Sequence, residues 1–366
     1  MIDVGIGRLA AGELARPAGD RSRLAGFVIA SLGALLVAVL FLSIASGPTG
    51  FMPGRALSIV GEALVGRADV ADRDVLVILE IRIPRAAFSL MIGAALATAG
   101  CVMQSLFRNP LADPGLVGIS SGAALAAVVM IVLGGPLVAS LPHVARLYAL
   151  PSAAFLGALA ATAILYAIAT REGRTSIATM LLAGIAISAL AAAVVGFLVF
   201  MSDDRQLRDI TFWSLGTLGG ATWEKVLVLS PFIGLALLAF ARFAADLDAM
   251  LLGEAEAARL GVPVERLKRM AIVTVAAAAG TSVALTGVIG FVGLVVPHLL
   301  RLMIGPTHRA LLPASALAGA ALLTAADIVC RIVVAPAELP IGILTALFGS
   351  PFFLWLLLRR RSVLDI

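Results

Sequence analysis

The sequence predicts an all-α polytopic membrane protein with about ten transmembrane helices. Of its 366 residues, 61% are hydrophobic and 13% are charged, and the mean hydropathy is +1.08. Soluble domains carry about 25% charged residues, so this composition lies well outside their range. Apolar runs also follow one another along almost the whole chain, many of them near the ~20 residues that a transmembrane helix needs. We therefore expect one transmembrane domain over residues 24–358, between polar tails at 1–23 and 359–366.

The apolar runs define ten expected spans. The first run is too long, and followed by too many others, to be a cleaved signal peptide. Two short helices are expected outside the spans, over residues 55–65 and within 202–223, the second ending near Gly216. The junction between the seventh and eighth spans is the hardest to place. In order, the expected spans are residues 24–46, 83–107, 116–133, 149–170, 177–200, 226–243, 270–289, 293–304, 311–329 and 343–358.

Ten spans place both ends of the chain on the same side of the membrane. On that arrangement about 17 of the 27 lysine and arginine residues lie on the side of the termini, and about 10 lie on the other side. Cytoplasmic loops of membrane proteins carry the excess of positive charge. We therefore expect both termini in the cytoplasm. The net charge of +5 reflects arginines in short loops and does not indicate nucleic-acid binding.

Two glycine patterns predict how the spans pack. Gly115, Gly118 and Gly122 open the third span at short spacings that permit close contact between helices. GAALATAG at residues 93–100 is faintly echoed by GTSVALTG at residues 280–287. With five spans in each half, the two segments would run in opposite directions, which is typical of the inverted repeats of transporters. We therefore expect a weak inverted repeat.

The loop Leu251–Arg269 is the one long polar interruption in the second half of the chain. It predicts two short helices: the first begins with Glu254 and Glu256, where negative charge suits the helix dipole, and Gly261 is placed to cap its end. Pro263 suits the start of a second helix over residues 264–269. Arg266, Lys268 and Arg269 mark the loop as cytoplasmic. An ordinary solvated loop is one interpretation, and a rigid surface that a partner protein grips is the other.

The residues give little support to catalysis, and we expect no catalytic, cofactor-binding or metal site. Neither Lys225 nor Lys268 follows a glycine, so the chain has no phosphate-binding loop of the ATPase type. The three histidines do not have metal-ligand spacing, and no span carries a pair of carboxylates. Asp327 is one helical turn from Arg331, so an ion pair is the simplest interpretation of this intramembrane acid. A proton-driven carrier would have more such acids, and we expect another protein to supply the energy.

Several long motifs together resemble the FecCD/BtuC-type permease family, the membrane subunits of type II ABC importers for cobalamin, ferric siderophores and haem. The resemblance extends over nearly everything from about Arg23 to Arg359. The matching stretches are IRIPRAAFSLMIGAALATAGCVMQSLFRNPLADPGLVGISSGAAL from Ile81, MLLAGIAIS from Met180, LLGEAEAARLGVP from Leu251, SVALTGVIGFVGLVVPHLLRL from Ser282, HRALLPASALAGA from His308, and ADIVCRIVVAPAELPIGILTALFGSPFF from Ala326.

The resemblance implies a homodimer in the bacterial inner membrane, with two copies of an ABC ATPase inside and a periplasmic substrate-binding protein outside. ATP would act through the ATPase partner, and no cofactor would be stably bound. The family docks its binding protein through arginines, and the matching positions are Arg82 and Arg331. The helices after the sixth span seat on the ATPase in similar permeases. The matching residues here are Gly253, Glu254, Ala257, Arg259, Leu260, Gly261 and Pro263.

The same resemblance implies that the pathway runs along the dimer axis and is lined mainly by the fifth span. The cobalamin-type permease carries a Thr-Ser gate at the inner end of this span. The ungapped match here falls on Ile177 and Ala178, whereas Thr175 and Ser176 lie two residues earlier, so the pathway is expected to be less polar. The pathway candidates are Ser176, Ile177, Ala178, Thr179, Met180, Ser188 and Ala192.

Within the family, we rank haem first as the transported substrate, ferric siderophores second and cobalamin third, because the run from Arg108 to Leu125 resembles haem permeases most. Met103, Met180 and Met201 are interpreted as packing residues, although they could touch a flat hydrophobic ligand. None of His143, His298 and His308 lies in the fifth span, so the permease should hold haem only weakly. A stand-alone secondary carrier or channel is the alternative function, and a membrane enzyme is a distant third.

Overall fold

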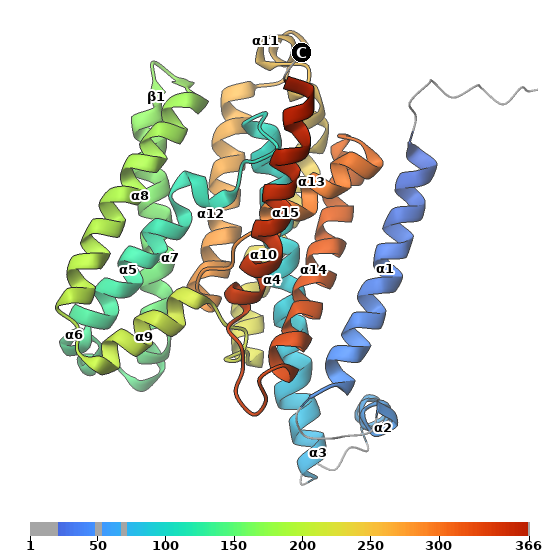
Figure 1. The fold of residues 1–366 in the computed structure, drawn as a ribbon, viewed down its shortest axis with the longest axis vertical. Coiled ribbons are helices and arrows are strands. Elements are labelled where there is room, and N and C mark those ends of the chain that lie inside the picture. Colours follow the sequence, from blue (N-terminus) through green and yellow to red (C-terminus); the bar gives the residue numbers. More distant parts are fainter. Residues whose placement is uncertain (1–20, 48–52, 67–71, 365–366) are drawn as a thin grey trace, which may run out of the picture.

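Seven helices are long and apolar enough to cross a membrane in the computed structural model, which describes residues 21–47, 53–66 and 72–364. Three shorter apolar helices bring the set to the ten expected spans (Figure 1). The long helices are α1 (Ser22–Ala45), α4 (Ile83–Leu106) with the turns before it, α7 (His143–Ala169), α8 (Ile177–Phe200), α10 (Trp223–Met250), α12 (Val264–Thr286) and α14 (His308–Ile332). The shorter ones are α5 (Ile119–Leu133), α13 (Val292–Ile304) and α15 (Ile341–Leu364).

Short elements close the two ends of the bundle. One end carries α11 (Glu254–Arg259) and the hairpin of β1 (Thr170–Arg171) and β2 (Arg174–Thr175), and we call it the α11 end (Figure 1). The opposite end carries α2 (Pro53–Leu64), and we call it the α2 end. The remaining short elements are α3 (Arg73–Leu76), the π-helical turn η1 (Val77–Arg82), the 3-10 turn η2 (Pro114–Val117), α6 (Gly135–Ser140) and α9 (Asp204–Leu215).

The predicted positions of the helices are confirmed, but several boundaries differ: α7 begins six residues early, at His143, and α10 runs seven residues further than expected, to Met250. The second span extends back to Arg73 through α3 and η1, about ten residues before the expected start. The second short helix expected over residues 264–269 is not separate, because α12 runs unbroken from Val264 into the seventh span. Nothing between Arg269 and Met270 interrupts helical hydrogen bonding, and only the hydropathy changes there. The polar loop therefore holds one short helix, α11, and the first turns of a long one.

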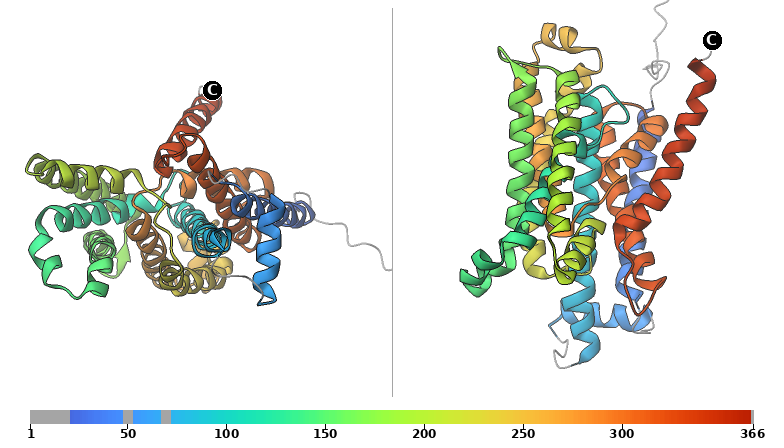
Figure 2. Two further views of the ribbon diagram at one scale, coloured as in Figure 1. Left: turned by 90° about the horizontal axis from the view of Figure 1, so that it is seen from below. Right: turned by 60° about the vertical axis from the view of Figure 1, so that its left-hand side comes forward.

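Helix α4 lies at the centre of the bundle, and α8 lies at its edge. Among the long spans, the segment that includes α4 is the most buried and α8 is the least buried. The view along the bundle shows α4 surrounded by other helices and α8 at the outside (Figure 2). A side chain on Gly93 would collide with the backbone of Gly319, so these glycines let α4 and α14 pack backbone to backbone. The central helix is thus fixed from several sides, whereas α8 is not.

The glycines predicted to open the third span divide between two roles. Gly122 makes the expected close contact, because a side chain there would collide with Gly157 of α7. Gly118 instead adopts a φ of +78° and begins α5, and Gly115 lies in the preceding 3-10 turn. Helices α4 and α12 pack side by side and run in opposite directions, as the faint sequence echo predicts (Figure 1). A repeat of the two whole halves stays a prediction.

Candidate functional site

The loop at the α11 end is a capped and rigid projection. Gly253 enters α11 with a φ of +109°, and Gly261 leaves it with a φ of +88°. The N–H groups of Gly261 and Val262 donate to the carbonyl oxygens of Ala258 and Ala257, each at 3.0 Å, which closes the last turn. The left-handed cap predicted at Gly261 is therefore confirmed. Pro263 precedes the first residue of α12 instead of occupying it.

One face of this projection is open to solvent and is partly apolar. Leu252 and Leu260 are two-thirds exposed, which is unusual for large apolar side chains on a polar loop. Arg259 is also exposed and pairs with Glu256 at 2.6 Å. Ala257, however, is fully buried and faces the bundle, so it supports α11 from behind the open face, and a contact of Ala257 with a partner stays a prediction. The exposed residues on this face are Leu251, Leu252, Ala255, Glu256, Ala258, Arg259, Leu260 and Gly261.

Lys268 lies behind that face and is buried among hydrogen-bond acceptors. Its side chain is 2% exposed, and its Nζ donates to Glu254 Oε2 at 2.7 Å, to Glu265 Oε1 at 3.0 Å and to the carbonyl oxygen of Thr175 at 3.1 Å. Three acceptors match the three donors of an ammonium group. Of the three basic residues that mark this loop as cytoplasmic, Arg266 and Arg269 are therefore exposed, whereas Lys268 is buried.

Thr175 connects this loop to the start of α8. Its N–H donates to Glu265 Oε2 at 3.0 Å, while its carbonyl oxygen accepts from Lys268. Ser176 follows and caps α8, because its Oγ accepts from the N–H of Thr179 at 3.3 Å. The first turn of α8 is thus held through β2 by the first turns of α12. The one signal in the sequence was the spacing of Glu265 and Lys268, which places them on one helix face; nothing local pointed to Thr175.

The pathway candidates on α8 divide by exposure. Four of them are exposed, two are half-buried, and Met180 is fully buried in the core. Met180 therefore faces the core of the bundle in this conformation, and its place among the pathway residues stays a prediction. The Oγ of Ser188 lies 3.2 Å from the Oγ of Ser121 on α5, so Ser188 faces a neighbouring helix. The exposed candidates are Ser176, Ala178, Thr179 and Ala192, and the half-buried ones are Ile177 and Ser188.

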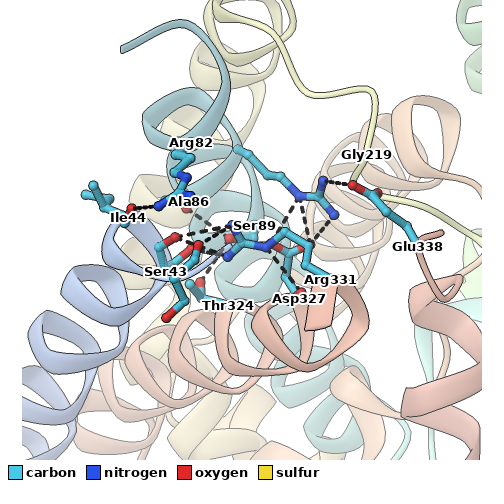
Figure 3. Close-up of polar contacts among 12 residues, drawn as sticks. Ser43, Ile44, Arg82, Ala86, Ser89, Gly219, Thr324, Asp327, Arg331 and Glu338 are labelled. Atoms are coloured by element: carbon cyan, nitrogen blue, oxygen red, sulfur yellow. Dashed lines mark hydrogen bonds and ion pairs between the residues drawn. The ribbon is translucent and has the colours of Figure 1, made fainter. Parts of the chain in front are cut away.

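A second cluster of charges lies at the α2 end, but inside the bundle (Figure 3). Arg85 of α4 pairs with Asp327 of α14 at 2.8 Å and with Glu338 at 2.7 Å. Arg331 reaches the same Asp327 at 3.1 Å and donates to Ser43 of α1. The ion pair predicted between Asp327 and Arg331 is confirmed. The sequence did not reveal that Arg85 shares this carboxylate, because the two residues are 242 positions apart.

The arginines assigned to docking are both buried. Arg82 donates to the carbonyl oxygen of Ile44 at 2.7 Å, and Arg331 donates to the carbonyl oxygen of Ser43 at 3.2 Å. These bonds tie the last turn of α1 to α4 and α14, as Figure 3 shows for Arg82 and Arg331. The expectation that these side chains are presented to a partner is therefore wrong in this structure. A role in docking stays a prediction, and it would require these bonds to open.

None of the three histidines belongs to α8. His308 is fully buried at the start of α14, where Nδ1 lies 2.7 Å from Asp248 Oδ1 and Nε2 lies in hydrogen-bonding contact with Ser105. It therefore joins α14 to α10 and α4. His298 is buried in α13, and His143 begins α7. Within the described residues, no group of three or more His, Cys, Asp or Glu side chains is arranged to hold a metal ion.

Comparisons with known proteins agree on the kind of protein this chain resembles. The profile of the FecCD transport family matches residues 35–359. The hemin transport system permease protein HmuU of Yersinia pestis is 48% identical over 284 residues, which cover 78% of this chain and 84% of the relative. The vitamin B12 import system permease protein BtuC of Citrobacter koseri is 39% identical over 333 residues, 91% of this chain and 94% of the relative.

The solved structures give the same result at the level of the fold. A metal-chelate type ABC transporter in an inward-facing conformation superimposes with a TM-score of 0.78 and 30% sequence identity. The match covers 91% of this chain and 99% of that one. Among the relatives found by sequence, the cobalamin import system permease protein BtuC of Halobacterium salinarum is also similar, with 40% identity over 86% of this chain and 82% of the relative. The all-helical polytopic architecture is therefore shared along nearly the whole length.

Proposed function

This chain belongs to the FecCD transport family, and from that membership we propose that it is the permease subunit of an ATP-driven haem importer. It would take haem from a periplasmic binding protein and release it into the cytoplasm. ATP hydrolysis would take place on a separate ABC ATPase, two copies of which would serve a permease homodimer. The observation that carries the proposal is the α11 projection, a capped element with exposed leucines in a chain that has no phosphate-binding loop of its own.

The geometry of α11 suits contact with an ATPase. A helix held by two glycine-bearing turns keeps its shape when it is pushed, so it can pass on a displacement that a flexible loop would absorb. Leu252 and Leu260 offer apolar area for a groove, and the Glu256–Arg259 pair offers charge at its rim. The contact residues that we propose are Gly253, Glu254, Arg259, Leu260, Gly261 and Pro263, to which the structure adds Leu252 as an exposed neighbour.

The sparse packing of α8 supports a homodimer with its pathway at the two-fold axis. This span has the fewest buried residues of the seven long helices, and it carries exposed Ala178, Ala192 and Ala193 together with exposed large apolar side chains. A second copy of the chain would cover part of this face and enclose the rest. The pathway would then be lined by small and apolar side chains, with hydroxyl groups from Ser176 and Thr179 at the α11 end and from the half-buried Ser188 further along α8.

Such a lining suits haem, which is a flat and largely apolar molecule. The 48% identity to a hemin permease exceeds the 40% and 39% identities to the cobalamin permeases quoted above. We therefore rank haem first, ferric siderophores second and cobalamin third. Because no histidine lies in α8, the permease itself should bind haem weakly, and the binding protein should provide the tight site. A ligand held tightly in the pathway could not leave it readily.

We propose that the α11 end faces the cytoplasm of a bacterium and that the α2 end faces the periplasm. Both termini would then be cytoplasmic, since the start of α1 and the end of α15 lie at the α11 end (Figure 1). The binding protein would dock at the α2 end. Arg82 and Arg331 would support that surface indirectly, because their hydrogen bonds hold the end of α1 against α4 and α14 beneath it.

Transport by a purified system tests the proposal. The permease is reconstituted in liposomes with its ATPase and its haem-loaded binding protein, and haem uptake is measured with and without ATP. We expect uptake that requires ATP, the ATPase and the binding protein, and that excess cobalamin does not inhibit. Uptake driven by an ion gradient without the ATPase would instead establish the alternative, a secondary carrier. Competition by cobalamin or a ferric siderophore would reassign the substrate.

A further inference from the structure

Lys268 joins three segments that are distant in the sequence or separated by a turn. Its acceptors come from the start of α11, from the first turn of α12, and from β2, which leads directly into α8. The side chain is 2% exposed, whereas Glu254 and Glu265 are 34% and 37% exposed. The cation is therefore shielded from water, and its bonds are charge-assisted, short and directional. Such bonds resist stretching more than contacts between apolar side chains do.

The bonds to Thr175 form a clamp and not a single tether. Glu265 accepts from the N–H of Thr175 at 3.0 Å, and Lys268 donates to its carbonyl oxygen at 3.1 Å. Both backbone groups of one residue are thus fixed by side chains one helical turn apart on α12. Glu254 then adds α11 to the same ammonium group at 2.7 Å. A displacement of α11 is transmitted to Thr175 through two hydrogen bonds.

The segment beyond Thr175 is free to respond. Ser176 begins α8, which is the least buried long span, while α12 is among the more buried ones. A force applied at Lys268 therefore meets more resistance from α12 than from α8. A cavity of about 670 Å³ lies beside the clamp and leaves room for movement. It is lined by Arg108, Thr175, Ser176, Ile177, Leu252 and residues 253–256.

We infer that Lys268 is a positioning residue that transmits the movement of α11 to the first turn of α8. The inference rests on the proposed function, in which the ATPase grips α11 and α8 lines the pathway. Movement of α11 displaces Glu254, the bond from Glu254 to Lys268 passes the displacement on, and the bond from Lys268 to Thr175 moves β2. Ser176 and Thr179, the hydroxyl-bearing residues of the first turn of α8, are the groups that move. The link places the control of the cytoplasmic mouth on a residue that touches neither ATPase nor haem.

A double-mutant cycle tests this inference in the reconstituted importer. Glu254→Ala, Lys268→Met and the double variant are compared by the number of ATP molecules hydrolysed per haem transported. Each single variant should raise this ratio about tenfold, which is the order expected when a charge-assisted bond is lost. Because Glu254 also lies in the proposed ATPase contact, all four proteins are compared at saturating ATPase. The double variant should then raise the ratio no further than Lys268→Met alone, because Glu254 acts through Lys268. Lys225→Met, which removes the only other lysine at the opposite end of the bundle, should leave the ratio unchanged.

Two further measurements separate coupling from folding and from ATPase binding. Lys268→Met should bind the ATPase with unchanged affinity, since Lys268 is buried behind the contact face, and it should hydrolyse ATP at a rate near that of the wild type. Additive effects, in which the double variant raises the ratio by about the product of the single effects, would overturn the inference. So would tight coupling in Lys268→Met. If the wild type itself shows no ATP-dependent uptake, the proposed function fails first.

Discussion

The two charged clusters of this protein have similar chemistry and opposite settings. The cluster at the α11 end contains Lys268, Glu254, Glu265 and the backbone of Thr175, and its carboxylates are about one-third exposed. The cluster at the α2 end contains Arg85, Asp327, Arg331, Ser43 and Glu338. There the shared carboxylate of Asp327 is 1% exposed and the guanidinium of Arg85 is 7% exposed. The first cluster opens toward a surface, whereas Arg85, Asp327 and Arg331 of the second are enclosed among α1, α4 and α14, and only Glu338, which is 45% exposed, reaches the surface.

This difference predicts different mechanical roles. Separating a buried ion pair leaves charges without solvent, so the α2-end cluster should keep α1, α4 and α14 together in every state. The carboxylates at the α11 end can be hydrated if their bonds stretch. Breaking the ion pairs of the α11-end cluster therefore costs less free energy than breaking those of the α2-end cluster. A transporter needs both kinds of element: a fixed frame at the end where the binding protein docks, and a movable link where the ATPase acts.

The largest expected effect is the loss of Asp327. Asp327→Ala leaves the guanidiniums of Arg85 and Arg331 buried without their shared carboxylate, which should cost roughly 3–5 kcal/mol of stability. We expect a sharply lower melting temperature in detergent and a low yield of folded protein. Glu338→Gln is the matched control, because Glu338 is 45% exposed and contacts only Arg85 in this cluster. A melting temperature for Asp327→Ala equal to that of the control would show that this cluster does not hold α1, α4 and α14 together.

Lys268→Met should have a smaller effect on stability. It removes three hydrogen bonds, but Glu254 and Glu265 can turn to water, so we expect a loss of about 2–3 kcal/mol. The melting temperature of the purified permease should therefore fall between those of the wild type and Asp327→Ala. If Lys268→Met were the more damaging change, the ranking of the two clusters would be reversed.

Sequence reasoning succeeded where structure is local and failed where it is not. Apolar runs and the glycine and proline of the loop predict ten spans and the cap at Gly261, because hydropathy and backbone preference are properties of short stretches. They could not predict that Arg85 and Arg331 share Asp327, or that Lys268 binds Thr175. Those contacts depend on which helices become neighbours. The resemblance to the family assigns Arg82 and Arg331 to a docking surface, but it carries no information on the neighbouring helices that bury both side chains here.

The same reasoning explains which of the proposed site residues the structure leaves exposed. Leu260 and Arg259 are exposed as predicted for a partner surface, while Ala257 is buried because it lies on the other face of α11. Ser176 and Thr179 lie at the open start of α8, but Met180 turns into the core. Sequence spacing assigns residues to a helix, and only packing decides which face is covered.

Gly261→Val should affect coupling more than stability. Gly261 has a φ of +88°, and a Cβ atom there would meet no other atom within 4 Å, so the main cost within the chain is backbone strain of about 1–2 kcal/mol. We expect normal insertion into the membrane, weaker binding of α11 to the ATPase, and more ATP molecules hydrolysed per haem transported. Gly261→Asn, which tolerates a left-handed backbone better, should be milder. Normal ATP-driven uptake by Gly261→Val would argue against α11 as the coupling element.

The smallest effect is expected from Arg259→Met. The Arg259–Glu256 pair is exposed and spaced i,i+3, so its loss should cost only about 0.3 kcal/mol. The melting temperature should be unchanged, while the affinity for the ATPase should fall if this side chain lies at the rim of the contact. A clear loss of stability would mean that the open face of α11 contributes to the fold and is not reserved for a partner.

Distances between spin labels in the assembled importer test the central claim most directly. Cysteines replace the exposed Arg174 of the hairpin, Ala258 of α11 and Arg309 of α14, and the native Cys101 and Cys330 are buried. If Lys268 couples α11 to the start of α8, ATP binding should change the distance between positions 174 and 309 and leave that between 174 and 258 constant. In Lys268→Met, the 174–258 distance should change instead. A wild-type protein in which 174–258 varies while 174–309 stays fixed would contradict the account.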